Sequence, residues 1–505
     1  MSGEVKRLFK TIGGHLTFRH IKHYVGAVYL AQAVAAMRSF INARYLGPGD
    51  YGFWGWLVFV ISLGYFLHLG TQEMMLKEVP ALRAKKRFDE SERLVQLSFS
   101  FYLVMLFIGA GLMAGMVFVL SGPVSSIYQV GWIIAGAVMI IEVLYYFEQV
   151  VARSMGYFSK IGETLFVTNI VSLVLTCWLV IHHGITGIYW VAILTPLFGF
   201  IYLHRYTKYR FRFVWDGVRI KKNICNGWPI VAMGLCFLAV GWVDRGIIMK
   251  YLGIKAHGYY TFGATISFML FLFPKGLADV FEPKLHFHHA LEKPGHSIRK
   301  NFLGPVYVLA WLMPVFLLVG HSLLPLVLKL FLPDYLPGLL VMRVLIWTSY
   351  FVGLIAMTKS SLVALNRQLY TVPAIIAAIL INAGMSLWMV GNGYGVAGVA
   401  VGSTTALCIV SLWLVWLIIG ELDQSKWVSF QCFLKIYLPF AILGLPCLTW
   451  AWLTEMPSSS PAAWLYSFPI AGIAIYFSAG FYFLMKWFIK SNLKKDAMES
   501  VEVIP

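Results

Sequence analysis

Three arginines interrupt long apolar runs of this sequence: Arg38, Arg245 and Arg343. A guanidinium in such a run costs several kcal/mol unless it faces a partner or a water-filled cavity. Its planar fork forms two parallel hydrogen bonds to a phosphate or pyrophosphate group, and it keeps its charge when buried. These residues therefore favour recognition of an anionic group.

Further polar residues accompany the arginines at helical spacing. Asn42 shares a face with Arg38, Asp244 precedes Arg245, and Glu142 and Gln149 lie on one helical stripe. Two interpretations stay open: the residues line a hydrated, substrate-facing cavity, or Arg38 and Arg245 form structural ion pairs with Asp244 or Glu142. The candidate binding residues are Arg38, Asn42, Glu142, Gln149, Asp244, Arg245 and Arg343.

The composition indicates that these residues belong to an integral membrane protein. Hydrophobic residues make up 59% of the 505 residues and charged residues 12%, with a mean hydropathy of +0.75. A soluble domain has roughly a quarter of its residues charged. Apolar stretches of about 20 residues cross a hydrocarbon core of roughly 30 Å as helices. We count fourteen, at 23–45, 51–76, 95–120, 130–152, 161–182, 185–203, 225–251, 258–281, 303–330, 337–358, 369–391, 395–419, 434–453 and 463–487.

The distribution of cations predicts the topology. Most of the 40 Lys and Arg lie in the N-terminal tail, in every second connection and in the C-terminal tail. The positive-inside rule places these segments on the cytoplasmic side of the cell's inner membrane. Both termini are therefore expected in the cytoplasm. The basic run 205–222 is expected to lie on an anionic lipid leaflet, and nucleic acid is not expected as a partner.

One hairpin occurs twice in the sequence. The run Tyr45–Gly52 returns 206 residues later as Tyr251–Gly258. We expect Gly47 and Gly253 to end helices at sharp turns, and Gly52 and Gly258 to allow close backbone approach. A repeat of this kind inside a membrane chain predicts two pseudo-symmetric lobes, with the two hairpins meeting at an outer gate.

Catalytic sequence patterns are missing. The predicted outer connections are too short to hold catalytic carboxylates beside water, and no glycine-rich phosphate loop occurs, so we expect no enzyme. The six cysteines and the histidines of 286–289 lack metal-ligand spacing. No metal or cofactor is expected; a coupling ion, proton or sodium, is left open.

The run from Tyr45 to Gly70 resembles the first hairpin of the polysaccharide and oligosaccharide flippases, of O-antigen type, within the multidrug, oligosaccharidyl-lipid and polysaccharide exporter superfamily. The same resemblance is carried by the segments 331–337, 365–368, 381–382 and 392–400. It extends over most of residues 20–420.

This resemblance implies an all-α integral membrane protein with two six-helix lobes in a V and two extra C-terminal helices. The repeat assigns residues 1–206 and 207–420 to the lobes, and 421–505 to the extra helices. The implied cargo is an oligosaccharide on polyprenyl pyrophosphate, moved by alternating access. The implied partners are membrane lipids and, in the same pathway, glycosyltransferases and a glycan polymerase. A peptidoglycan-precursor flippase, a multidrug antiporter, and a membrane glycan polymerase or ligase are the alternatives.

Overall fold

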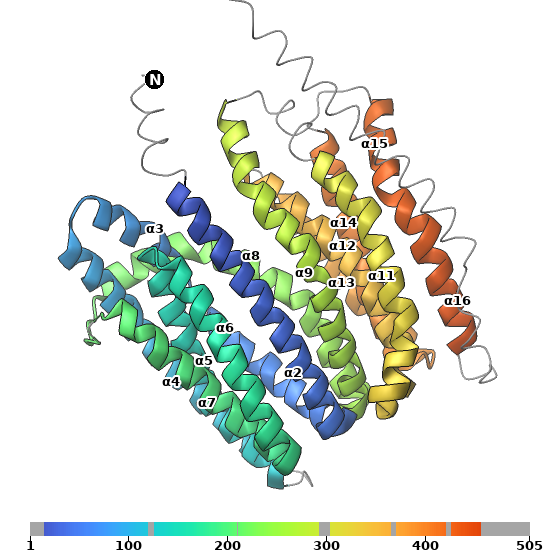
Figure 1. The fold of residues 1–505 in the computed structure, drawn as a ribbon, viewed down its shortest axis with the longest axis horizontal. Coiled ribbons are helices and arrows are strands. Elements are labelled where there is room, and N and C mark those ends of the chain that lie inside the picture. Colours follow the sequence, from blue (N-terminus) through green and yellow to red (C-terminus); the bar gives the residue numbers. More distant parts are fainter. Residues whose placement is uncertain are drawn as a thin grey trace, which may run out of the picture. The chain divides into compact units, whose positions relative to one another are not determined.

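The computed structural model describes residues 15–119, 126–209, 211–291, 303–364, 370–420 and 426–455. These residues form helices and contain no strand (Figure 1). Contacts between Cα atoms divide the chain into two compact units, 1–261 and 262–505, and each is described separately.

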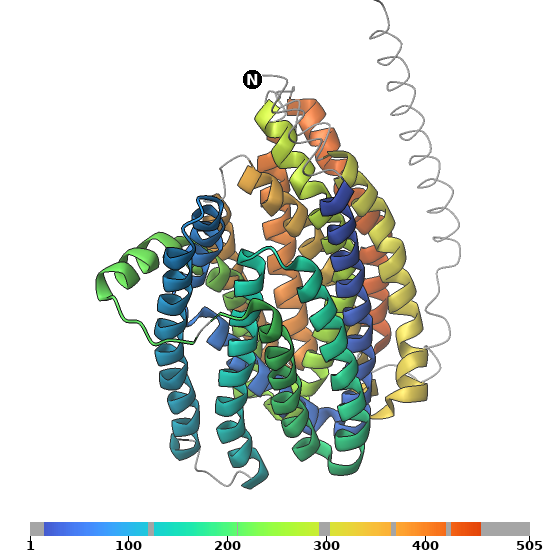
Figure 2. The same ribbon diagram turned by 60° about the vertical axis from the view of Figure 1, so that its left-hand side comes forward.

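The first unit contains the two copies of the hairpin. Neighbouring helices such as α4 and α5 run side by side in it, as the blue and teal helices of Figure 2 show. Its elements are α2 (His15–Ser62), η1 (Leu63–Phe66), α3 (Thr71–Ala84), α4 (Phe88–Val119), α5 (Ser126–Ser154), α6 (Phe158–Leu175), the π-helical turn η2 (Thr176–Val180), α7 (Ile181–Thr207), α8 (Gly217–Tyr251) and the first residues of α9 (Gly253–Leu291).

The second unit continues α9 and packs six further helices around a large apolar core. Trp347, Tyr350 and Phe351 are almost completely buried in it. The elements are α11 (Gly304–Phe331), η4 (Pro333–Gly338), α12 (Leu339–Ala364), α13 (Thr371–Gly391), α14 (Gly395–Gly420), α15 (Lys426–Pro439), the π-helical turn η6 (Phe440–Gly444) and α16 (Leu445–Glu455).

Eight of the described helices are long and apolar enough to cross a membrane, and a bent pair makes a ninth. The chain is therefore a multi-pass, all-α membrane protein, and this span count is consistent with the predicted fourteen. The predicted last span, 463–487, lies outside the described residues, as does the motif 365–368. The predicted lobe boundaries follow the repeat, not the contacts, and remain a prediction.

The prediction of one unbroken helix over 51–76 is wrong. The structure breaks it at 67–70, and α3 continues at 50° to the preceding helix. Leu69 and Gly70 have φ angles of 48° and 102°, which end the helical path. A Cβ on Gly70 would lie 2.5 Å from the backbone carbon of Gly227 in α8, so the break brings two backbones together.

The two hairpin copies meet in the first unit. Gly47 has a φ of 66° inside α2, and Gly253 has a φ of 83° between α8 and α9, so each glycine turns the chain. A Cβ on Gly52 would lie 2.2 Å from the Ile254 carbonyl oxygen, and one on Gly258 would lie 1.8 Å from that of Pro48. The backbones of the two hairpins therefore touch directly. We call this contact the glycine junction.

His257 fastens the glycine junction. Its side chain is fully buried, and its Nδ1 lies 2.9 Å from the Gly52 carbonyl oxygen. The ring packs edge-on against Trp56, and the Thr261 hydroxyl lies 3.2 Å from the same nitrogen. A neutral imidazole that donates from Nδ1 satisfies the carbonyl group exposed by the close approach.

The glycine junction can be tested by adding one methyl group. We expect Gly258→Ala to lower the thermal unfolding midpoint of the purified protein, because the new Cβ meets backbone atoms that cannot rotate away. Overpacking of this kind costs about 1–3 kcal/mol. Gly49→Ala is the matched control, since nothing lies within 4 Å of its Cβ position. Equal midpoints for the two variants would contradict the close contact.

Candidate functional site

Arg38 lies in the first half of α2, nine residues before Gly47, which places it about 13 Å below that turn. Its side chain is half-buried, and its Nη1 donates a short hydrogen bond to the Ser172 hydroxyl of α6. The Glu142 carboxylate and the Tyr51 phenol are close enough to act on it electrostatically. Arg38 thus has a neutral hydrogen-bond partner and a carboxylate at longer range.

Glu142 is held by a tyrosine. Its Oε1 accepts a hydrogen bond of 2.7 Å from the Tyr65 hydroxyl, and Tyr146 packs edge-on against the ring of Tyr65, with centroids 5.0 Å apart. Tyr65 belongs to η1, directly before the break in the second membrane helix. The break therefore positions the donor that holds this carboxylate.

Asn42 and Gln149 are buried residues of α2 and α5, the helices that carry Arg38 and Glu142. Asn42 is 7% exposed and Gln149 is 8% exposed. The Asn42 Oδ1 is buried and accepts no hydrogen bond in the described structure. A buried amide oxygen without a donor costs about 1–3 kcal/mol, so this atom calls for a hydrogen-bond donor from water or a ligand.

Asp244 and Arg245 are adjacent in α8 and have different partners. Asp244 is 3% exposed, and its Oδ2 accepts a hydrogen bond of 2.5 Å from the Tyr260 hydroxyl. The guanidinium carbon of Arg245 lies 4.7 Å above the centroid of the Phe59 ring, a cation–π contact. Its Nη1 reaches the Gly241 carbonyl oxygen at 3.4 Å, and its Nε is buried without an acceptor.

The structural ion pairs considered from the sequence are not seen. Within 4 Å, the described residues form three pairs of opposite charge: Arg87–Glu90, Lys160–Glu163 and His204–Glu148. None of them contains Arg38 or Arg245. Tyrosines hold both carboxylates that were candidates for such pairing.

Arg343 belongs to the second unit, in α12. It is 3% exposed and acts electrostatically on His321, which accepts a hydrogen bond of 3.2 Å from the Trp347 indole. The structure therefore places it in a packed core. The other candidate residues lie in the first unit. Two contacting helices, α2 and α5, carry Arg38, Asn42, Glu142 and Gln149. On α8, Asp244 is adjacent to Arg245, which contacts Phe59 of α2.

Five neighbours of the predicted residues escaped the sequence reasoning: Phe59, Tyr65, Ser172, His257 and Tyr260. The repeat carried a signal for two of them, since His257 and Tyr260 fall in the second hairpin copy, at the offset of Tyr51 and Trp54. Ser172 lies in an uncharged apolar stretch and has no such signal.

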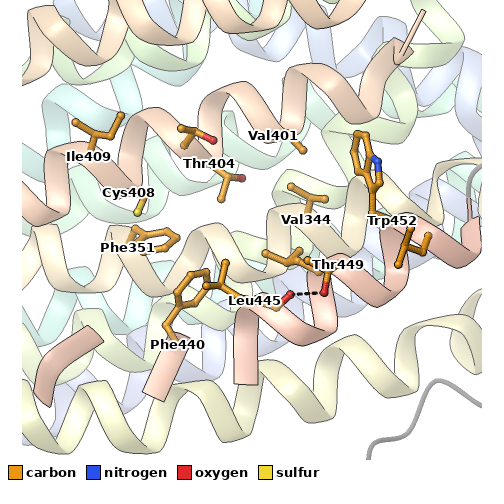
Figure 3. Close-up of a pocket in the computed structure, with 13 residues that line it drawn as sticks. Val344, Phe351, Val401, Thr404, Cys408, Ile409, Phe440, Leu445, Thr449 and Trp452 are labelled. Carbon is orange, nitrogen blue, oxygen red and sulfur yellow. Dashed lines mark hydrogen bonds between the residues drawn. The ribbon is translucent and has the colours of Figure 1, made fainter. Parts of the chain in front are cut away.

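A cavity of about 470 Å³ lies in the second unit, between α12, α14 and the α15–α16 helix. Phe351, Cys408 and Phe440 form one part of its wall and Trp452 lies at the other end (Figure 3). The hydroxyls of Thr404 and Thr449 are bonded to carbonyl oxygens of their own helices, so the wall is apolar. None of the candidate binding residues lines this cavity.

Among the described residues, no three His, Cys, Asp or Glu side chains gather where they could hold a metal ion. The site consists instead of cations, amides, tyrosine-bound carboxylates and aromatic rings. Such a set binds and orients a polar or anionic molecule.

Comparison with known proteins gives one family match. Residues 41–285 match the model of the family described as polysaccharide biosynthesis protein. No curated protein sequence matches the chain.

Several solved structures share the fold. The lipid II flippase MurJ in an inward closed conformation is 15% identical, with a TM-score of 0.67, and the match covers 93% of this chain and 99% of MurJ. An inward-facing multidrug resistance transporter of the MATE family is 14% identical, with a TM-score of 0.63, covering 78% of this chain and 96% of the other. A MOP superfamily transporter from Pyrococcus furiosus, whose binding pocket has reversed polarity, is 14% identical with a TM-score of 0.53, covering 80% and 96%.

The structural matches cover most of the chain and show that it has the same fold as these solved transporters. Residues 41–285, slightly less than half of the chain, are similar to the family of polysaccharide biosynthesis proteins.

Proposed function

We propose that this protein flips a polyprenyl-pyrophosphate-linked oligosaccharide across the cytoplasmic membrane by alternating access, for the biosynthesis of a surface polysaccharide. The observation that carries the proposal is that Arg38 and Arg245 lie in α2 and α8, on the predicted spans 23–45 and 225–251, and form no ion pair with a carboxylate of the described chain. Two such cations are costly in the resting protein and favour an anionic cargo.

Pyrophosphate suits these cations better than a carboxylate or a neutral sugar does. A guanidinium offers parallel N–H donors to two phosphate oxygens, and Arg245 keeps its Nε buried without an acceptor. The sugars need hydrogen-bonding groups, which the buried amides of Asn42 and Gln149 supply. The prenyl tail stays in the lipid.

The comparisons support this cargo class. The family model concerns polysaccharide biosynthesis, and one structural relative is a flippase of a lipid-linked precursor, lipid II. A peptidoglycan-precursor flippase is therefore the second candidate. A multidrug antiporter for cationic drugs fits less well, because its site would need free carboxylates, whereas Glu142 and Asp244 here accept hydrogen bonds from tyrosines. A glycan polymerase or ligase would need longer outer connections than the sequence predicts.

Transport requires the two predicted lobes, 1–206 and 207–420, to rock against each other. The glycine junction joins helices of both, α2 and α8–α9, and is the contact expected at the closed outer gate. Gly47, Gly52, Gly253 and Gly258 thus serve the gate through backbone geometry. The glycosyltransferases and the polymerase of the pathway would act before and after this step.

Removing the arginines tests the cargo site. We expect Arg38→Ala and Arg245→Ala to fold at normal levels but to fail to restore surface glycan in a strain lacking its flippase. Lysine at either position should restore it only in part, because it keeps the charge and loses the two-pronged geometry. Arg44→Ala and Lys250→Ala are matched controls, since both are exposed cations at the ends of the same two helices.

If the arginines instead hold the fold together through ion pairs, the alanine variants should lose stability. Breaking a buried ion pair costs about 3–5 kcal/mol, so the alanine variants would then lose thermal stability. Neutralising Glu142 or Asp244 together with the arginine would restore it. Glycan export by such a charge-free double variant would exclude cargo binding by the arginines.

The topology has its own test. In a cysteine-free background, a cysteine at Asn392 should react with an impermeant thiol reagent added outside intact cells, and one at Lys86 should not. Both side chains are exposed, so only their side of the membrane differs. The reverse pattern would place both termini outside.

Cross-linking tests the gate. We expect cysteines at Gly49 and Lys255 to form a disulfide when the outer gate is closed, because each lies in one of the two touching hairpins and disulfide formation needs Cα atoms within roughly 7 Å. Flipping should stop on oxidation and return on reduction. Full transport by a completely cross-linked sample would show that the glycine junction does not open.

A further inference from the structure

A further buried carboxylate in the first unit, besides Glu142 and Asp244, takes no part in the proposed cargo site. Glu148 lies on α5, six residues before its end at Ser154, or about 9 Å along the helix. Its side chain is fully buried. An ionised carboxylate at such a position needs donors for both oxygens, and a neutral one needs far less.

The donors of Glu148 come from the end of α7. Its Oε1 accepts a short hydrogen bond from the Thr207 hydroxyl and lies 3.3 Å from Nδ1 of His204. Its Oε2 is buried and has no hydrogen-bond partner within the described structure. The carboxylate therefore has donors on one oxygen only, which leaves its ionised form incompletely solvated.

Tyr209 faces the same carboxylate from the connection that follows α7. It is 6% exposed, and burial together with the nearby Glu148 raises the pKa of its phenol above the usual range. The phenol therefore stays neutral beside Glu148, and its buried hydroxyl has no hydrogen-bond partner in the described structure.

The remaining surroundings are aromatic or are charged groups directed elsewhere. Phe147 lies beside Glu148 on α5 and contacts Phe99 of α4 and Tyr209. The His204 ring stacks on Phe200 and on Phe211. Arg153, the cation at the end of α5, acts on Glu73 of α3 and on Tyr146. His204 is therefore the ionisable base in contact with Glu148 among the described residues.

His204 also connects Glu148 with water. Its side chain is 30% exposed, whereas that of Glu148 is 0% exposed. A proton taken up by the imidazole from water passes from Nδ1 to Oε1, which breaks one N–H bond and forms one O–H bond. The neutral imidazole then recovers its proton from water.

The connection from α7 to α8 follows directly after His204 and Thr207, the two residues that contact Glu148. Lys208 turns the chain at a φ of 50°, and the Val214 amide donates a 2.8 Å hydrogen bond to the Ser100 hydroxyl of α4. Asp216 then caps α8, accepting from the Arg219 amide at 3.1 Å. Since α8 carries Asp244 and Arg245, the connection links Glu148 to the helix of the proposed cargo site.

We propose that Glu148 and His204 form a proton-binding site that holds the end of α7, and with it the connection described at 208–209 and 211–216, when Glu148 is ionised and that loosens both when Glu148 is protonated. Protonation removes the charge that the Thr207 hydroxyl and the His204 imidazole contact, so these contacts weaken. Tyr209, whose ring packs against that of His204, then loses part of its support. The role of this proton in transport rests on the proposed flippase function; the site itself does not. A sodium ion suits the site less well, because an imidazole and aromatic rings offer it few oxygens.

The test places an environment-sensitive fluorophore on Arg212→Cys, an exposed position of the connection, in full-length protein whose six native cysteines are replaced. The protein is titrated in nanodiscs between about pH 5 and 8.5, the range in which histidines and buried carboxyls titrate. We expect a single-proton transition at constant sodium concentration. His204→Asn should keep the transition and move its midpoint up by about one pH unit, because the carboxylate loses a cationic neighbour. Glu148→Gln should abolish it.

Glu163→Gln is the matched control. Glu163 is half-exposed and paired with Lys160 at 2.8 Å, so its replacement should leave the transition unchanged. No transition in the parent protein, a transition that survives Glu148→Gln, one that vanishes with His204→Asn, or one that follows sodium at fixed pH would each overturn the proposal.

Proteoliposomes with a pH gradient and a fluorescent polyprenyl-pyrophosphate disaccharide provide the second readout. Flipping that responds to the gradient in the parent protein and not in Glu148→Gln supports coupling. A fluorophore transition without any flipping would refute the proposed cargo and leave the proton site standing, whereas gradient-independent flipping would refute coupling alone.

Discussion

The close backbone contact between the two hairpin copies determines how the first unit is built. With no side chains at Gly52 and Gly258, the main chains of α2 and of the α8–α9 turn approach to distances that a Cβ atom would prevent. A second contact of the same kind, between Gly70 and Gly227, joins the break before α3 to α8. Between these two points, α8 lies close enough to α2 for Arg245 to cover the Phe59 ring.

Tyrosines decide the chemistry between those two contacts. Tyr65 donates to Glu142 and Tyr260 donates to Asp244, so each carboxylate is satisfied by a neutral donor. Had Arg38 or Arg245 filled these positions, the site would be a pair of neutralised salt bridges with little affinity for an anion. A hydroxyl donor instead leaves the arginines with Ser172 and an aromatic face, partners that an incoming phosphate can replace or supplement.

Composition and the internal repeat were enough to predict an all-helical membrane fold and the glycines that turn the two hairpins. The break at 67–70 was not predictable in this way, because the apolar stretch continues through Leu67 and Leu69 and the cause, contact with Gly227, lies far along the chain. Nor does Tyr65 stand out among 26 tyrosines. The sequence locates costly charges; only the fold shows which neutral groups accompany them.

The glycine junction is also suited to opening. A contact made by glycine backbones buries little apolar side-chain surface, and at about 25 cal/mol per Å² its separation forfeits correspondingly little hydrophobic free energy. The packed aromatic core around Trp347 and Tyr350 in the second unit has the opposite character, since pulling it apart would expose several large rings. Separation at the glycine junction is therefore expected to cost less hydrophobic free energy than separation of that core. The Gly52 carbonyl and His257 each lose a hydrogen bond there, and water in an opened gate restores both. A contact that is tight in geometry and weak in free energy allows a gate to close fully and still open in every cycle.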